Sequence, residues 1–346
     1  MTTAKKERAP RNRTVTLTEE ERSELGKRCV QVTEPTTLEL ILNKTICQDS
    51  LEVIDKLPPD SVDLIFADPP YKLTKTFNGR TFSWKTLQDY EDYLEAWIPA
   101  LVRVLKPRGS FYICGDWRSS SAIHRVAETY LNVQNRITWE REKGRGAKSN
   151  WKNSAEDIWF CTKSASYTFQ VENVKLKRRV VAPYKDAKGK PKGWENTDTG
   201  NFRLTYPSNV WMDLTVPFWS MPENTDHPTQ KPEKLVAKVI LASSREGDVV
   251  LDPFLGSGTT SVVAKKLNRN YIGIEIDEMY AALAEKRLEM ADNDESIQGY
   301  YENVFWERNT LALQMADENR MEKEAKKREV GRPSENVKAE EAPLFP

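Results

Sequence analysis

The stretch that most constrains the fold of this chain is V-D-L-I-F-A-D-P-P-Y, residues 62–71. It begins with a short, largely apolar run rich in β-formers, as expected of a strand covered on both faces of a parallel sheet. Asp68 then places a carboxylate at the carboxyl end of this strand. Pro69 and Pro70 fix two φ angles and donate no backbone N–H, so their carbonyl oxygens remain available as acceptors. Beside the flat ring of Tyr71, these acceptors suit an amino group on an aromatic base, and an ordinary proline-rich turn is the alternative.

The overall composition limits the class of protein. The chain has 346 residues and a formal net charge of zero, so any surface for nucleic acid has to be local. This length allows one large core with an insertion, or two small domains. No apolar run approaches the length of a membrane span, and no hydrophobic stretch follows the Lys/Arg-rich N-terminus. We therefore expect no signal peptide, no membrane contact and a cytoplasmic location.

The four cysteines, Cys29, Cys47, Cys114 and Cys161, are scattered along the chain without C-x-x-C spacing. This pattern indicates reduced core residues of a cytoplasmic protein. The chain has two histidines, so a zinc site built from His and Cys is not expected, and we predict no metal.

From residue 45 onward, strand-like and helix-like segments alternate, which predicts a mostly parallel sheet with helices on both faces. Strands are expected over 45–47, 62–67, 110–114, 135–140, 157–162, 248–251 and 271–276, and helices over 51–57, 87–105, 119–131, 232–242, 259–267 and 279–290. Between 168 and 226 the alternation stops, and lysines and arginines mix with aromatic residues. Cations for phosphates and rings for bases are what a nucleic-acid surface needs, and a solvated loop over a small subdomain is the alternative.

These changes in pattern divide the chain into five segments. We predict a flexible basic arm (1–24), a first α/β half that contains the Asp-Pro-Pro-Tyr loop (25–167), an insertion (168–226), a second α/β half (227–291), and a charged appendage and tail (292–346). Residues 299–313 keep some apolar side chains and are expected to pack as an appendage. Residues 72–85 are expected to form a polar loop with a turn at Asn78-Gly79.

A second chemical centre follows the insertion. Residues 249–260, V-V-L-D-P-F-L-G-S-G-T-T, predict a strand, a glycine loop and a helix. Gly256 and Gly258 let the backbone approach a ligand closely, and the N-terminus of the helix favours a negative group. Glu275 stands near the carboxyl end of the next strand, where a carboxylate can accept hydrogen bonds from both hydroxyls of a ribose.

Together, D-P-P-Y at 68–71 and D-P-F-L-G-S-G-T-T at 252–260 resemble the amino-group DNA methyltransferases that use S-adenosylmethionine. The D-P-P-Y form is similar to that of the N6-adenine members. The catalytic loop precedes the cofactor loop, and the basic aromatic segment lies between them. This order resembles the β class, whose sheet is a circular permutation of the usual methyltransferase sheet. H-P-T-Q-K-P at 227–232 also matches, and the resemblance extends over residues 45–290.

The resemblance implies a Rossmann-like methyltransferase fold with a mostly parallel seven-stranded sheet, and it implies that the insertion at 168–226 recognises the DNA target. It implies that Asp68, Pro69 and Pro70 hold the amino group of a flipped base and that Tyr71 stacks on this base. The residues implied for the cofactor are Asp49, Lys231, Asp252, Phe254, Gly256, Ser257, Gly258, Thr259, Glu275 and Ile276. Those implied for DNA phosphates are Lys175, Lys177, Arg178, Arg179, Lys190 and Lys192, with Trp151 and Asn153 as further candidates. Asp49 equally suits the cap of the helix expected at 51–57.

The hypothesis is therefore a site-specific methyltransferase that acts on the N6 amino group of adenine in double-stranded DNA. A homodimer and a cognate restriction endonuclease are the further partners that the resemblance brings in. Methylation of cytosine N4, an RNA substrate and a non-catalytic DNA-binding protein of the same fold stay open as alternatives. The intact motifs disfavour the non-catalytic protein. The basic aromatic insertion disfavours a small-molecule or protein substrate.

Overall fold

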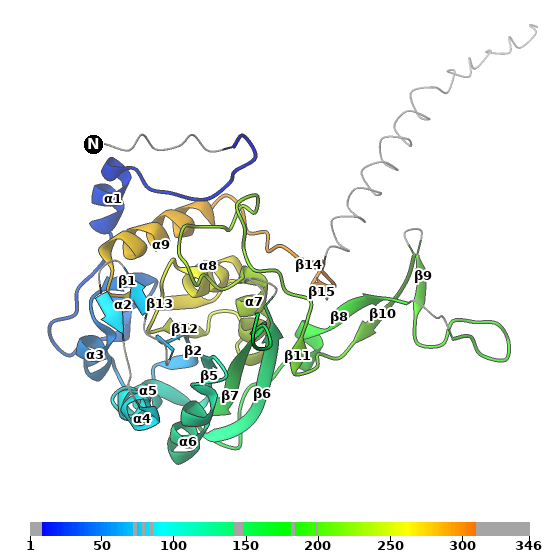
Figure 1. The fold of residues 1–346 in the computed structure, drawn as a ribbon, viewed down its shortest axis with the longest axis horizontal. Coiled ribbons are helices and arrows are strands. Elements are labelled where there is room, and N and C mark those ends of the chain that lie inside the picture. The colour runs from blue at the N-terminus through cyan, green and yellow to red at the C-terminus, as the bar shows by residue number, and fades with distance from the viewer. Residues whose placement is uncertain are drawn as a thin grey trace, which may run out of the picture.

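The computed structural model describes residues 9–71, 75–77, 80–82, 86–141, 148–180, 184–197 and 200–308, and a mostly parallel sheet forms its centre (Figure 1). Its strands are β1 (Lys44–Cys47), β2 (Val62–Ala67), β5 (Leu105–Gly115), β6 (Asn132–Glu140), β7 (Ala155–Thr162), β11 (Val210–Trp211), β12 (Val249–Asp252) and β13 (Asn270–Glu275). They follow the order β1-β13-β12-β2-β5-β7-β6-β11. Neighbours are parallel except where β7 pairs with β5 and β6. The sheet has eight strands rather than the predicted seven, because β11 from the insertion pairs with β6.

Helices cover both faces of this sheet, as the alternating pattern predicts. One face carries α3 (Ser50–Val53), the 3-10 helix η1 (Ile54–Lys56), α4 (Leu87–Glu95), α5 (Ile98–Val104) and α6 (Ser120–Tyr130). The other carries α7 (Glu233–Ser243) and α8 (Thr259–Lys266), with α9 (Glu278–Met290) beside α8. The short helix α2 (Leu38–Ile41) lies next to β1, and the 3-10 helix η2 (Val171–Val174) lies next to α7.

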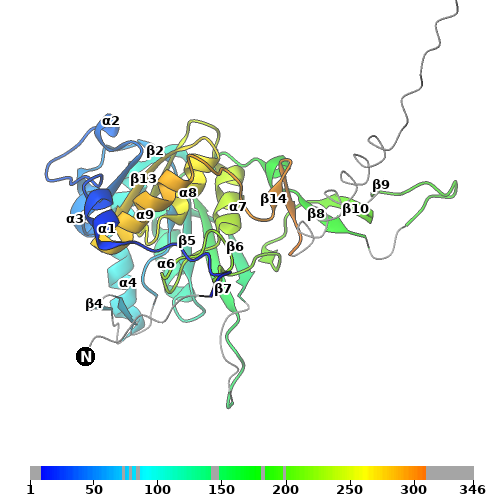
Figure 2. The same ribbon diagram turned by 90° about the horizontal axis from the view of Figure 1, so that it is seen from above.

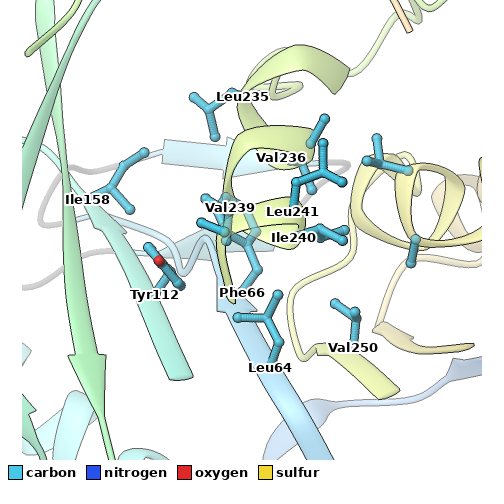
Figure 3. Packing of buried hydrophobic residues seen from close by; sticks show 14 of the residues in the cluster. Leu64, Phe66, Tyr112, Ile158, Leu235, Val236, Val239, Ile240, Leu241 and Val250 are labelled. Atoms are coloured by element: carbon cyan, nitrogen blue, oxygen red, sulfur yellow. The ribbon is translucent and has the colours of Figure 1, made fainter. Parts of the chain in front are cut away.

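The side chains of β2 alternate between the two cores, which explains why the strand reads as apolar on both faces. Leu64 and Phe66 belong to the core under α7, where Val239 also packs (Figure 3). Ile65 and Ala67 belong to the core on the opposite face. This alternation follows from the two-residue period of a strand.

The helix predicted over 87–105 is two helices, and the break lies at Trp97 and Pro99. Trp97 leaves the helical conformation, with φ −131° and ψ −28°. Pro99 provides no N–H donor, and its ring would collide with the carbonyl of the residue four positions earlier in a continuous helix. The break turns the buried Trp97 ring toward Phe254, at 5.2 Å between ring centroids.

The insertion builds a second sheet that projects from the body in both views (Figures 1 and 2). It contains β8 (Leu176–Arg179), β9 (Glu195–Thr197), β10 (Gly200–Thr205), β14 (Tyr300–Tyr301) and β15 (Val304–Trp306), in the order β14-β15-β8-β10-β9. Strands β14 and β15 come from the segment expected to form an appendage. A separate hairpin, β3 (Lys75–Phe77) with β4 (Arg80–Phe82), replaces the polar loop predicted over 72–85. The turn expected at Asn78-Gly79 lies outside the described residues.

The N-terminal segment is fixed to the body, so the prediction of a flexible arm is wrong for residues 13–24. Helix α1 (Glu19–Gly26) begins with a capping box between Thr18 and Glu21 and lies beside α9. Val15 forms a parallel bridge with Thr225. Residues 1–8 lie outside the described part of the chain. None of the described helices is long and apolar enough to cross a membrane.

A glycine at the start of α8 provides a test of this packing. Gly258 has φ +88°, and a Cβ added there would meet the Cβ of Ala284 in α9 at 2.6 Å. Gly258→Ala adds a clash to left-handed strain, so we expect it to lower the free energy of unfolding by about 3 kcal/mol. Gly247→Ala is the matched control, because Gly247 has φ +81° with nothing within 4 Å. Strain alone should cost about 1 kcal/mol there. Equal shifts of the two urea midpoints would contradict the clash.

Candidate active site

The centre of the sheet contains a point at which the connections diverge. From β12 the chain passes to β13 on one side, whereas from the neighbouring β2 it passes to β5 on the other. The carboxyl ends of such strands open a crevice, where ligands bind in α/β proteins. The loop at 68–71 and the glycine loop both lie here and line one cavity of about 190 Å³.

This cavity brings together most of the residues that the sequence predicts for a site. Of these it is lined by Asp49, Asp68, Pro69, Pro70, Tyr71, Phe254, Gly256, Glu275 and Ile276. Lys231, Asp252, Ser257 and Thr259 instead line a smaller cavity of about 30 Å³, which shares Asp68, Phe254 and Gly256 with the first. Gly258 packs on Ala284 and lines neither cavity.

Glu275 links the glycine loop to the cavity. Its Oε2 accepts a hydrogen bond from the Gly256 N–H at 2.7 Å, and its Oε1 accepts one from the Asp277 N–H at 2.8 Å. A carboxylate offers about four acceptor sites, so two remain for a ligand with neighbouring hydroxyls. Burial raises the pKa of Glu275 to about 7.

Asp252 fixes the two ends of the glycine loop through hydrogen bonds. Its Oδ1 accepts from the Phe254 N–H at 2.9 Å, and its Oδ2 accepts from the Thr260 hydroxyl at 2.5 Å. Burial raises the pKa of Asp252 to about 7. Both oxygens of Asp252 therefore accept hydrogen bonds from within the protein. This favours a structural role for Asp252 in addition to the predicted contact with a cofactor.

Asp49 caps a helix, as one of its two sequence-based interpretations predicts. Its Oδ1 accepts from the Leu51 N–H at 3.0 Å, at the start of α3. The same residue lines the cavity, so capping leaves its second oxygen on the ligand side.

His227 is a site residue that sequence reasoning did not single out beyond its motif. Gly256 has φ +56°, and a Cβ added there would meet Nε2 of His227 at 3.1 Å. The imidazole contacts the Tyr280 ring edge-on, with 4.4 Å between ring centroids. Burial and the Lys231 ammonium lower the pKa of His227 to about 4, so the ring is neutral near pH 7. Gly256 is therefore required both by its backbone conformation and by the space that His227 fills.

The 68–71 loop is held by a buried polar network. The Tyr71 hydroxyl donates to Oδ1 of Asp68 at 2.6 Å, and Nζ of Lys231 donates to Oδ2 of Asp68 at 2.5 Å. Lys231, predicted to bind a cofactor, thus contacts the catalytic loop. Glu156 and Arg141, which form an ion pair at 2.5 Å, join the network although the sequence did not reveal them. A period-two strand pattern would have marked Glu156 as a buried charge at the start of β7.

The residues predicted for DNA phosphates separate into two groups. Lys177, Arg178 and Arg179 lie on β8 and Lys175 directly precedes it, whereas Lys190 and Lys192 lie in the exposed loop that precedes β9. The Lys175 ammonium pairs with Glu172 at 2.5 Å, and the Lys177 ammonium lies 4.2 Å from the Trp306 ring centroid. Of the two further candidates, Trp151 is 93% exposed.

The comparisons with known proteins agree with this geometry. A family model described as DNA methylase matches residues 62–286. The chain is 34% identical over 253 residues to the Type II methyltransferase M.HpaI of Haemophilus parainfluenzae, covering 72% of this chain and 75% of that protein. It is 35% identical over 271 residues to the DNA adenine methyltransferase YhdJ of Escherichia coli K12, covering 75% and 87%.

Among solved structures, the chain is similar to the PvuII DNA methyltransferase, described as cytosine-N4-specific. The TM-score is 0.51 at 19% identity, and the match covers 75% of this chain and 93% of that chain. At this level of sequence identity the similarity shows a shared fold alone. That fold agrees with the Rossmann-like methyltransferase fold expected from the sequence.

Asp252 provides a test of the electrostatics at the site. Because burial raises its folded pKa from 3.8 to about 7, the folded state binds the extra proton. The resulting stabilisation is full below pH 3.8 and is lost as the pH rises through about 7. Asp252→Asn removes this loss, so its unfolding free energy relative to the wild type should rise by up to about 4 kcal/mol over that range.

Urea unfolding at a series of pH values measures this difference. Glu52→Gln, at an exposed position of α3, is the control and should leave the shape of the pH curve unchanged. A constant difference between Asp252→Asn and the wild type would contradict the assigned titration.

Proposed function

This chain belongs to the DNA methylase family, and we propose that it moves a methyl group from S-adenosylmethionine to the N6 amino group of an adenine flipped out of duplex DNA. The observation that carries this proposal is that Asp68-Pro69-Pro70-Tyr71, the glycine loop and Glu275 line one cavity. The choice of adenine draws support from YhdJ, which is named a DNA adenine methyltransferase. The cytosine-specific structure shares the fold, and a shared fold carries no information about the base.

The residues around the cavity fit S-adenosylmethionine. Glu275 retains two acceptor sites for the ribose hydroxyls, and Gly256 leaves the backbone open to a close approach. Phe254 and Ile276 offer apolar surface for the adenine ring, and Asp49 offers an acceptor for its amino group. When bound, this cofactor supplies a methyl group from a positively charged sulfur, and the sulfur becomes a neutral thioether when the methyl group leaves.

Asp68 and the Pro69 carbonyl carry the chemistry on the substrate side. Together they accept hydrogen bonds from both N–H groups of the amino group and turn the nitrogen lone pair toward the methyl carbon. Alignment of this kind supplies several kcal/mol of the rate acceleration. Positive charge develops on the nitrogen during transfer, and the Asp68 carboxylate stabilises it until the nitrogen releases one proton to water.

The same edge of the sheet offers surface for DNA. Trp117 follows β5 and is 64% exposed, and the guanidinium of Arg118 lies 5.2 Å from its ring centroid. The Asp116 carboxylate accepts from the Arg118 and Ser119 N–H groups, which fixes the turn that presents both side chains. We also propose that the insertion at 168–226 recognises the DNA target. It provides a cationic loop at the end of the projecting sheet.

The further partners and the location follow from this activity. A cognate restriction endonuclease fits a chain that resembles M.HpaI, which is named a Type II methyltransferase. A homodimer remains part of the proposal through the β-class resemblance. We propose a cytoplasmic location, where DNA and the cofactor are both present.

Nucleoside mass spectrometry of duplex DNA treated with the purified chain and S-adenosylmethionine tests the proposed activity. We expect N6-methyladenine, because Asp68 and Pro69 present acceptors to an amino group and the relative YhdJ is named an adenine methyltransferase. Single-molecule sequencing of the same DNA gives the recognition sequence. Asp68→Asn should lower the transfer rate by at least about 100-fold while the cofactor still binds. N4-methylcytosine in place of N6-methyladenine would overturn the choice of base, and full activity of Asp68→Asn would overturn the mechanism.

The salt dependence of DNA binding tests the two groups of basic residues. Lys188, Lys190 and Lys192 lie in an exposed loop in which Asp186 Oδ1 accepts the Lys188 and Lys190 N–H groups, both at 2.9 Å. Each phosphate contact contributes about 0.9 to the slope of log affinity against log salt. We therefore expect replacement of all three lysines by Gln to reduce the slope by roughly 2 to 3.

Lys175→Gln with Lys177→Gln is the matched control, because the Lys175 ammonium pairs with Glu172 and the Lys177 ammonium lies against the Trp306 ring. This pair should change the slope by less than about 1. Titrations of a fixed duplex at several salt concentrations measure both slopes. A larger effect from the control pair would assign the DNA contact to β8 instead of the loop.

A further inference from the structure

The Lys231 ammonium lies among three oxygen atoms beneath the 68–71 loop. Its Nζ is 2.5 Å from Oδ2 of Asp68, 3.1 Å from the Tyr71 hydroxyl oxygen and 3.5 Å from Oε2 of Glu156. The side chains of Lys231 and Glu156 are each 7% exposed. Burial by itself lowers the pKa of Lys231, but the Asp68 and Glu156 carboxylates outweigh it and raise that pKa above its ordinary value. The ammonium is therefore charged and shared by two carboxylates.

This sharing matters because Asp68 acts through its negative charge. A buried ammonium paired with Asp68 alone would cancel much of the field that stabilises a positive charge on the amino nitrogen. Glu156 provides a second anion on the other side of Lys231. Its Oε1 accepts from Arg141, whose side chain is 30% exposed and thus partly screened by water.

We propose that Glu156 is a positioning residue that shares the Lys231 ammonium with Asp68 and balances part of its charge, so that Asp68 keeps both its orientation and its effective charge. This role rests on the proposed methyl transfer. Glu156 touches neither the base nor the cofactor in this role and acts through Lys231 and the Tyr71 hydroxyl, which lies 3.3 Å from its Oε2.

Three further groups near Lys231, the Cys114 thiol, the Tyr71 hydroxyl and the His227 imidazole, are neutral near pH 7. Burial raises the pKa of the Cys114 thiol and of the Tyr71 hydroxyl, and it lowers the pKa of His227 to about 4. Asp68, Glu156 and Lys231, with Arg141 on the outer side, therefore set the charge beneath the loop. Removal of one of the inner charges unbalances this set, whereas removal of Glu156 and Lys231 together leaves Asp68 as the single inner charge.

Glu156→Gln keeps the size of the side chain and removes its charge. We expect the single-turnover rate of methyl transfer to fall at least about tenfold. Cofactor affinity should stay near the wild-type value, whereas the melting temperature should fall, because Lys231 and Arg141 each lose a charged partner. Glu156→Asp, which keeps the charge, should retain more of the rate than Glu156→Gln. A Glu156→Gln variant with the wild-type rate, or one whose only defect is lost cofactor affinity, would overturn the proposal.

A double-mutant cycle tests the coupling directly. Lys231→Met alone leaves two carboxylates facing each other, and one of them then takes up a proton. The double variant Glu156→Gln with Lys231→Met should transfer methyl groups faster than Lys231→Met alone. Losses that simply add would overturn the proposal. Lys238→Met is the matched control, because Lys238 is a buried lysine of α7 that pairs with Asp213, and its loss should affect stability without lowering the transfer rate.

The wild type is measured in every assay, so that the proposed function and the role of Glu156 can be overturned independently. A wild type that methylates no DNA would overturn the proposed function. An active wild type whose rate is unaffected by Glu156→Gln would overturn the role of Glu156 and leave the proposed function intact.

Discussion

A single buried ammonium connects three segments that are far apart in the sequence. Lys231 precedes α7, Asp68 follows β2, and Glu156 is the second residue of β7. Carboxylate oxygens of Asp68 and Glu156 both lie within 3.5 Å of the Lys231 Nζ. Removing a charged group from water costs several kcal/mol, which only close and complete pairing offsets. The alternative to this arrangement is an uncompensated buried charge. The network therefore fixes the 68–71 loop and the entry to α7 relative to each other before any ligand binds.

Much of the fold and half of this network could be predicted from the sequence, because local patterns determine them. The apolar run at 62–67 matches β2 residue for residue, since a strand buried on both faces leaves a compact signal. The glycine loop is recognisable because positive φ angles at 256 and 258 require glycine. The burial of Glu156 leaves a local signal in the two-residue period of β7, but its contact with Lys231 depends on the antiparallel register of β7 on β5 and on the packing of α7, which no local pattern records.

The errors in the prediction have a similar origin. Residues 13–24 were assigned to a flexible arm on composition, although the Thr18 to Glu21 spacing of a capping box was visible. The anchor of that segment, the bridge between Val15 and Thr225, is a tertiary contact. Strand β11 consists of two residues, so only its pairing with β6 defines it. Pro99, by contrast, was an available signal for the break between α4 and α5.

The carboxylates at the carboxyl edge of the sheet are stabilised in two different ways. Asp252 and Glu275 accept hydrogen bonds from backbone N–H groups and a hydroxyl, and burial raises their pKa values to about 7. Asp68 has an ammonium at 2.5 Å. The buried Lys231 ammonium thus pairs with Asp68, the carboxylate that has to act as an anion in the proposed chemistry. Asp252 and Glu275, which hold the glycine loop, accept hydrogen bonds instead. A cation this close would weaken Asp68 if nothing balanced it, and this need for balance explains why a second buried carboxylate stands on the other side of Lys231.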